Sequence, residues 1–118
     1  MIKKVLCLGN RLSEYRIMWV MVLFDLPTTE AKDRKAATQF RKDLQKDGFI
    51  MFQYSIYIRH CYSKENANVH IKRVKSCLPP EGDVCIFCIT DKQFGDIEVY
   101  HSIENKNNDK TWQQLELF

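Results

Sequence analysis

Hydrophobic positions along the chain follow two different periods, which predict strands and helices in a regular order. Residues 17–24 are an unbroken apolar run, as expected for a strand that is covered on both faces. Residues 49–58 form a longer strand-like run, which exceeds the usual strand of about 5–6 residues and is expected to bend or to split in two. Further strands are expected at 84–90, near 97–101 and at 115–118.

Two segments between these strands have the period of an amphipathic helix. The first spans about 28–47, with Thr28 or Thr29 to cap its start and Gly48 to stop it. The second spans about 64–78 and ends before a Pro-Pro-Glu-Gly turn. Each helix has one apolar stripe, and the rest of its surface is rich in lysine and arginine.

The order strand, helix, one or two strands, helix, strand, strand predicts an α+β fold. We expect a ferredoxin-like βαββαβ sandwich, with two helices on one face of a largely antiparallel sheet and an extra C-terminal strand. The domain is expected over 15–103 and a tail with the last short strand over 104–118. Residues 1–14 are expected to be an N-terminal extension, either a disordered arm or a misassigned start.

The second face of the predicted sheet has no evident cover in the sequence. Two helices can cover only one face, whereas the strands at 17–24 and 84–90 are apolar on both. A second copy packed sheet to sheet would cover the exposed face. We therefore expect an isologous homodimer.

Length and composition indicate one cytoplasmic domain. The chain has 118 residues and no apolar run near the roughly 20 residues that span a bilayer, so no membrane association is expected. Its start has too short an apolar stretch for a secretory signal, and its five cysteines are irregularly spaced. Cys85 and Cys88 form a C-x-x-C inside a strand, so their side chains are expected on opposite faces and cannot share one metal ion. We expect them to be inert thiols.

The charge distribution suggests two kinds of partner. Residues 28–79 carry eleven Lys/Arg against five Asp/Glu, whereas residues 80–118 carry three against eight. A basic middle fits a polyanion and an acidic end fits a protein contact, although solvated helix faces explain the charges as well. Five basic side chains of the first helix, if they share its outer surface, would follow a duplex phosphate backbone: Arg34, Lys35, Arg41, Lys42 and Lys46.

Asp25 is the main candidate for chemistry, because a carboxylate at the end of an apolar strand is costly unless it is paired, hydrated or metal-bound. If a two-fold axis passes near the strand end, two Asp25 carboxylates would meet and could share Mg²⁺ or Mn²⁺. The alternative is that Asp25 bonds its own backbone to begin a turn. Tyr57 and Tyr62 could stack on single strands, but aromatic residues of strands more often serve packing. Gln53 and Ser55 are minor candidates, and no other catalytic motif is present.

Five segments, taken together and in order, resemble the family of CRISPR-associated protein 2, and within it the members that belong to type II systems. They are 13–18 (Ser-Glu-Tyr-Arg-Ile-Met), 22–28 (Val-Leu-Phe-Asp-Leu-Pro-Thr), 40–42 (Phe-Arg-Lys), 48–57 (Gly-Phe-Ile-Met-Phe-Gln-Tyr-Ser-Ile-Tyr) and 89–94 (Ile-Thr-Asp-Lys-Gln-Phe). Each segment alone is weak, but the set is specific.

The resemblance implies a ferredoxin-like homodimer that binds the integrase, CRISPR-associated protein 1, holds foreign duplex DNA and inserts it as a new spacer. Asp25 matches the family aspartate that binds a divalent metal between protomers. Arg16, Arg34 and Arg41 are implied phosphate contacts, and a partner-binding tail is implied at Leu115, Leu117 and Phe118.

Three functions remain open from the sequence. Members of the family are named metal-dependent endoribonucleases. A single carboxylate per chain is, however, fewer groups than phosphodiester cleavage usually requires, which is two metal ions or a metal ion and a base. We therefore expect mainly a scaffold for DNA, with RNA as an alternative ligand. A ribonuclease toxin of related fold is the third reading.

Overall fold

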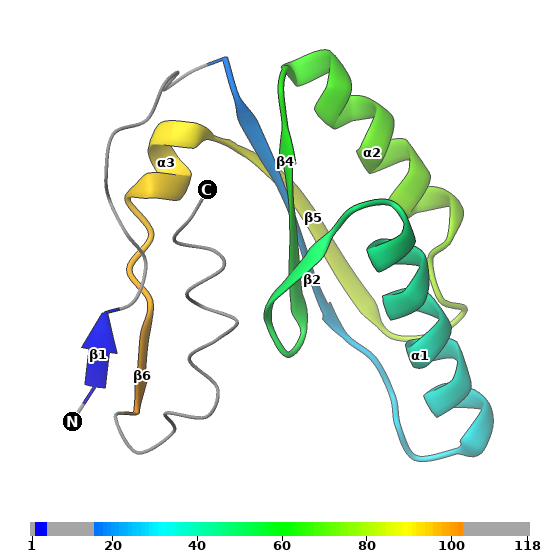
Figure 1. Cartoon of the computed structure of the whole chain (residues 1–118). Helices are drawn as coiled ribbons and strands as arrows, with labels where there is room; N and C mark the ends of the chain where they lie inside the picture. The colour runs from blue at the N-terminus through cyan, green and yellow to red at the C-terminus, as the bar shows by residue number, and fades with distance from the viewer. Residues whose placement is uncertain (1, 5–15, 103–118) are drawn as a thin grey trace.

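A computed structural model describes residues 2–4 and 16–102 of the chain. Its centre is a four-stranded antiparallel sheet in the order β3-β4-β2-β5. The strands are β2 (Met18–Asp25), β3 (Ile50–Gln53), β4 (Ile56–Cys61) and β5 (Asp83–Thr90). The helices α1 (Ala31–Lys46) and α2 (Lys64–Ser76) lie on one face of the sheet (Figure 1). This arrangement confirms the predicted ferredoxin-like α+β fold.

The main core lies between this sheet and the two long helices. Val20, Val22 and Phe24 of β2 face Phe40 and Leu44 of α1 and the buried residues of α2. Because β2 is central and has neighbours on both sides and both faces, it is apolar throughout, as the sequence predicted. Within the described residues, no helix is long and apolar enough to cross a membrane.

The two long helices begin in different ways. Ser63 caps α2, because its hydroxyl accepts a hydrogen bond from the backbone N–H of Asn66 at 3.0 Å. The predicted threonine cap of α1 is wrong: the helix starts at Ala31 after Glu30, which makes no side-chain cap. The carbonyls of the two threonines instead accept hydrogen bonds from Arg34, which holds the loop before the helix.

The long apolar run at 49–58 splits in two, as predicted, into the hairpin of β3 and β4. Residues 54 and 55 form the turn, and a register shift occurs between Met51 and Gln53. Apolar residues alternate between the two faces on each side of the turn. Ile50, Phe52, Ile56 and Ile58 belong to the cluster on the face away from the long helices.

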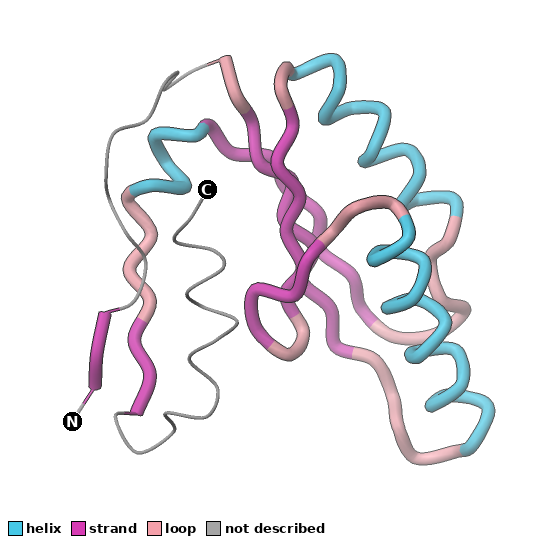
Figure 2. The backbone as a smooth tube through the Cα atoms, viewed as in Figure 1, coloured by secondary structure: helices cyan, strands magenta, loops and turns pink. Residues whose placement is uncertain are grey.

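This second face is partly covered by the chain itself, which corrects the expectation that no element was available. A short helix, α3 (Asp91–Gly95), and the residues after it lie on this side of the sheet (Figure 2). Phe94 stacks on Trp19 with ring centroids 3.9 Å apart, and Asp91 accepts a hydrogen bond from the indole Nε1 at 2.7 Å. Trp19 is consequently only 1% exposed.

The last described strand belongs to a separate two-stranded sheet. β6 (Tyr100–Ser102) pairs antiparallel with β1 (Ile2–Lys4), so three residues of the predicted N-terminal extension form a strand. A strand was expected near this position, at 97–101, and the observed one is shorter and begins later. The predicted strand at 115–118 lies outside the described residues.

Candidate functional site

Asp25 ends β2 on the second face of the sheet, the face that also carries Trp19 and Met21. It is exposed, and its carboxylate makes no hydrogen bond or ion pair with the residues that the structure describes. The alternative in which Asp25 bonds its own backbone to start a turn therefore has no support. The end of the strand presents this carboxylate to solvent.

Asp83, the first residue of β5, lies directly opposite Asp25 in the β2–β5 ladder. Residues that face each other across an antiparallel pair carry their side chains on the same face, with Cβ atoms about 4.5–5.5 Å apart. Each chain therefore offers two neighbouring carboxylates at this position. Sequence analysis missed Asp83, because the two residues are far apart in the chain and only the strand register brings them together.

An open hollow surrounds this pair at the end of the sheet. It has a volume of about 390 Å³ and its walls are mostly apolar. The residues that line it come from β2, β5 and the start of β4: Leu23, Phe24, Asp25, Ser55, Ile56, Asp83, Val84 and Cys85. The site thus combines two carboxylates with an apolar surface.

Gly82 fixes the backbone at the edge of this hollow. Its φ of +105° lies in the region that favours glycine. A Cβ at this position would lie 2.9 Å from the carbonyl oxygen of Asp25 and 2.7 Å from Cδ2 of Leu26. The absence of a side chain therefore lets the start of β5 approach the end of β2 and brings Asp83 into register.

The carboxylate pair fits the divalent ion that the family resemblance implies. Mg²⁺ and Mn²⁺ prefer hard oxygen ligands and readily keep several waters. Like charges directly opposite each other destabilise a strand pair, so a cation between them would relieve the repulsion. In the described part of the chain, no group of three or more His, Cys, Asp or Glu is placed to hold a metal. The remaining ligands would come from water or from a second copy.

The predicted basic residues do not form a single uniform surface. Lys35, Lys42 and Lys46 are exposed on α1, and Arg16 is exposed just before β2. Arg34 is also exposed, but its Nη1 donates to the carbonyl oxygens of Thr28 and Thr29, both at 2.9 Å.

Arg41 differs from the other basic residues of α1. It is half-buried, and its guanidinium carbon lies 4.5 Å from the ring centroid of Tyr54 and 5.2 Å from that of Phe24. Arg41 is therefore the basic residue of α1 that packs against the β3–β4 turn and the end of β2, on the face of the sheet opposite to Asp25.

The tyrosines have different roles from those expected. Tyr57 is 1% exposed in the main core, which confirms the packing alternative and leaves no surface for stacking on nucleic acid. Tyr62 is 70% exposed and remains accessible. Tyr54, at the β3–β4 turn, is 74% exposed and was not singled out, since a continuous strand would have placed it in an apolar face. Of the minor candidates, Ser55 lines the hollow and Gln53 is exposed at the end of β3.

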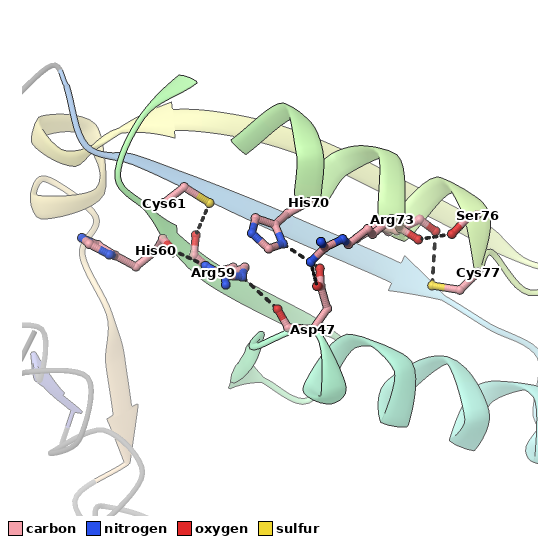
Figure 3. A network of polar contacts seen from close by, with 9 residues as sticks. Asp47, Arg59, His60, Cys61, His70, Arg73, Ser76 and Cys77 are labelled. Atoms are coloured by element: carbon pink, nitrogen blue, oxygen red, sulfur yellow. Dashed lines mark hydrogen bonds and ion pairs between the residues drawn. The ribbon is translucent and has the colours of Figure 1, made fainter. Parts of the chain in front are cut away.

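A polar network joins α1, α2 and β4 away from the hollow (Figure 3). Asp47 pairs through one carboxylate oxygen with Nδ1 of buried His70 at 2.8 Å, and the other accepts from Arg73 at 2.8 Å. Its backbone carbonyl accepts from Nε of Arg59 at 2.8 Å. Burial acts to raise the pKa of Asp47, but the hydrogen bonds from His70 and Arg73 outweigh it, so the pKa falls below its usual value.

The expectation of buried, inert thiols fits Cys88 better than Cys85, which is exposed. Burial raises the pKa of Cys61, Cys77 and Cys88, which keeps these thiols protonated at neutral pH. Cys88 packs against the main core, whereas Cys85 lines the hollow on the other face. The two members of the C-x-x-C therefore lie on opposite faces, as predicted. Leu115, Leu117 and Phe118 lie outside the described residues.

Comparison with known proteins identifies the family. The family model described as CRISPR associated protein Cas2 matches residues 18–97, which include the whole four-stranded sheet. A protein of Flavobacterium psychrophilum named CRISPR-associated endoribonuclease Cas2 is 54% identical over 109 residues, covering 92% of this chain and 95% of its own. A protein of Parvibaculum lavamentivorans with the same name is 52% identical over 101 residues, covering 86% of this chain and 100% of its own. With a family match over most of its length and relatives at this identity, the chain belongs to the Cas2 family of CRISPR-associated proteins.

Proposed function

We propose that the protein is a homodimeric scaffold for CRISPR adaptation, which works with the integrase, CRISPR-associated protein 1, to capture foreign DNA and insert it as a new spacer. The observation that carries this proposal is the half of the second sheet face that the described residues leave uncovered, which ends at Asp25. Family membership supplies the biological setting, and the surface chemistry of the chain supports the physical role.

The uncovered half-face supports the dimer. Helix α3 and the segment after it cover the Trp19 end of this face, whereas Leu23 and Ile56 are only half-buried and Phe87 is 39% exposed. Exposed apolar patches of this kind mark interaction sites. A second copy packed on this area would be related by a two-fold axis, with the same residues on both sides. The proposed interface is therefore smaller than the whole face that the sequence analysis expected.

The Asp25 end of this interface supports a shared metal ion. Two copies meeting near the strand end would bring together the Asp25–Asp83 pairs of both chains, and their oxygen atoms suit Mg²⁺ or Mn²⁺. When bound, such an ion would neutralise carboxylate charge and could polarise a phosphate oxygen. The chain's own contribution is to hold the carboxylates in register through the β2–β5 ladder and Gly82.

The outer surface of α1 supports binding to the phosphate backbone of duplex DNA. Lys35, Lys42 and Lys46 are exposed there, and contacts of this kind give affinity without reading base sequence. A dimer would present the surface twice and hold a duplex across both copies. Binding of this type weakens steeply with salt. RNA remains the alternative ligand, because phosphate contacts alone do not distinguish it.

The endoribonuclease activity in the names of the relatives is the second candidate. The Asp25–Asp83 pair favours this activity, because two carboxylates per chain supply more ligands for a catalytic metal ion than one. The family match argues against the ribonuclease toxin of related fold. The partner-binding tail, with Leu115, Leu117 and Phe118, is proposed to add a strand to a sheet edge of the integrase complex.

The experiment replaces Asp25 with alanine and measures spacer acquisition in cells and RNA cleavage by the purified dimer separately. We expect Asp25→Ala to retain acquisition and to lose any metal-dependent cleavage. Asp96→Ala, at an exposed aspartate after α3, is the matched control and should change neither. Loss of acquisition by a folded Asp25→Ala dimer would contradict the scaffold. A monomeric wild-type protein at micromolar concentration would contradict the dimer.

A further inference from the structure

Arg41 is held by aromatic rings rather than by acidic partners. Its guanidinium carbon lies 4.5 Å from the ring centroid of Tyr54 and 5.2 Å from that of Phe24, distances at which a cation is attracted to an aromatic face. The two rings come from different elements, the β3–β4 turn and the end of β2. The side chain is thus fixed by packing from two sides.

The hydrogen-bonding capacity of Arg41 is left unused by the described part of the chain. Nε is buried without a hydrogen-bond partner, and no carboxylate there pairs with the guanidinium. Guanidinium groups usually satisfy their five N–H donors, so a fixed one with no acceptor is unusual. Arg34 differs in this respect, because backbone carbonyls already occupy its Nη1.

Arg41 lies where α1 meets the β3–β4 turn, on the helix face of the sheet. The Phe24 ring that it contacts belongs to the main core on this face, whereas the next residue, Asp25, points to the other face. The backbone N–H of Phe24 donates to the carbonyl of Ser55 at 3.0 Å, which joins the turn to the end of β2. A ligand at Arg41 would therefore lie on the helix side of this strand end, together with the exposed lysines of α1.

We propose that Tyr54 is a positioning residue, which holds Arg41 as a receptor for one phosphate group of a bound nucleic-acid strand where α1 meets the β3–β4 turn. This inference rests on the proposed nucleic-acid function and deepens it. Arginine suits the role because its planar guanidinium can stack on a ring and still bind a phosphate through two N–H groups. The stack fixes the side chain before binding, so less conformational entropy is lost when the phosphate arrives.

The test measures the affinity of the full-length protein for a short DNA duplex and for a duplex with single-stranded ends, across a range of salt concentrations. Tyr54→Ala should weaken duplex binding about two- to fivefold, the range expected for an exposed cation–π contact. Tyr54→Phe keeps the ring and should bind like the wild type. Tyr100→Ala removes another exposed tyrosine, in β6, and serves as the matched control, with no expected change.

Variants of Arg41 separate positioning from direct contact. Arg41→Ala should reduce the slope of log affinity against log salt by about one phosphate contact. Adding Tyr54→Ala to Arg41→Ala should then have no further effect, because the ring acts through the guanidinium. A full loss from Tyr54→Ala in the Arg41→Ala background, above all with single-stranded ends, would show that Tyr54 stacks on a base and would overturn the inference. Unchanged affinity of Tyr54→Ala would overturn it as well.

A measurement without nucleic acid keeps the inference testable apart from the proposed function. The Nε–H proton of Arg41 should give a slowly exchanging NMR signal in the wild type and in Tyr54→Phe, and a fast-exchanging one in Tyr54→Ala. Fast exchange in the wild type would contradict the fixed guanidinium. If the NMR result holds but the wild type binds no duplex with salt-dependent affinity, then the proposed function fails and the phosphate receptor with it.

Discussion

Asp25 and Asp83 lie directly opposite each other where the β2–β5 ladder ends, with both carboxylates on the same face of the sheet. Two like charges at this spacing oppose the strand pairing that holds them. The same arrangement is well suited to a divalent cation. The site therefore has a stability signature that can be measured without any enzymatic assay.

We predict that Asp83→Asn stabilises the metal-free protein by about 0.5 kcal/mol at low salt, because it removes this repulsion. Added Mg²⁺ should raise the unfolding midpoint of the wild type more than that of Asp83→Asn or Asp25→Asn. Urea denaturation with and without Mg²⁺ measures both effects, and Asp96→Asn is the control for a general loss of negative charge. Equal protection of all four proteins by Mg²⁺ would rule out a site at this pair.

Gly82→Ala tests whether the close approach of β5 to β2 sets the site. The new Cβ would meet the carbonyl oxygen of Asp25 at 2.9 Å, and the φ of +105° is strained for alanine. We expect a loss of about 1–3 kcal/mol in the free energy of unfolding. Thermal or urea unfolding gives the value, with Glu81→Ala at the exposed neighbouring position as the control. A stability equal to that of the wild type would mean that the strand end is free to shift.

Replacement of Asp47 should destabilise the joint between α1 and α2. Asp47→Ala removes an acceptor that serves both His70 and Arg73, and we expect a cost of about 2 kcal/mol near pH 7. Asp43→Ala, on the same helix, loses only an exposed bond with Gln39 and is the matched control. Similar losses in the two variants would contradict a special role for Asp47.

The same aspartate should make stability depend on pH. The folded state lowers the pKa of Asp47 below its ordinary value of 3.8, because the ionised form is the one that His70 and Arg73 stabilise. This contribution is present above that value and disappears as the pH falls through the lower pKa of the folded state. The stability difference between wild type and Asp47→Asn should therefore shrink as the pH drops from about 5 to about 2. Unfolding midpoints of both proteins measured across this pH range test the prediction. A stability difference that does not change with pH would contradict it.

Asp91→Ala should loosen the cover on the second face of the sheet. It removes the buried acceptor 2.7 Å from the indole Nε1 of Trp19, and an unsatisfied buried donor costs about 1–3 kcal/mol. The fluorescence of Trp19 should shift to longer wavelength as water reaches the indole. Lys92→Ala changes the next, exposed residue and should leave both the stability and the emission unchanged. An unshifted spectrum of Trp19 in Asp91→Ala would contradict a role of this carboxylate in shielding the indole. Substitution of the remaining tryptophan, Trp112, isolates the Trp19 signal.

The order of the main elements and the fold class could be predicted from the amino-acid sequence. Hydrophobic periodicity is a local property, so the apolar run of β2, the split between β3 and β4 and the stripes of α1 and α2 were readable without coordinates. The family resemblance was readable too, because its segments are contiguous. Asp25 stood out for a similar local reason, as a carboxylate at the end of an apolar strand.

The contacts between residues far apart in the chain became visible in the folded structure. The register of β2 against β5 places Asp83 opposite Asp25, and the hairpin turn places Tyr54 on Arg41 rather than in an apolar face. Folding of α3 over Trp19 reduced the uncovered area that the sequence had assigned to a partner. These contacts join segments separated along the chain, and their geometry depends on packing and strand register, which local patterns of hydrophobicity do not encode.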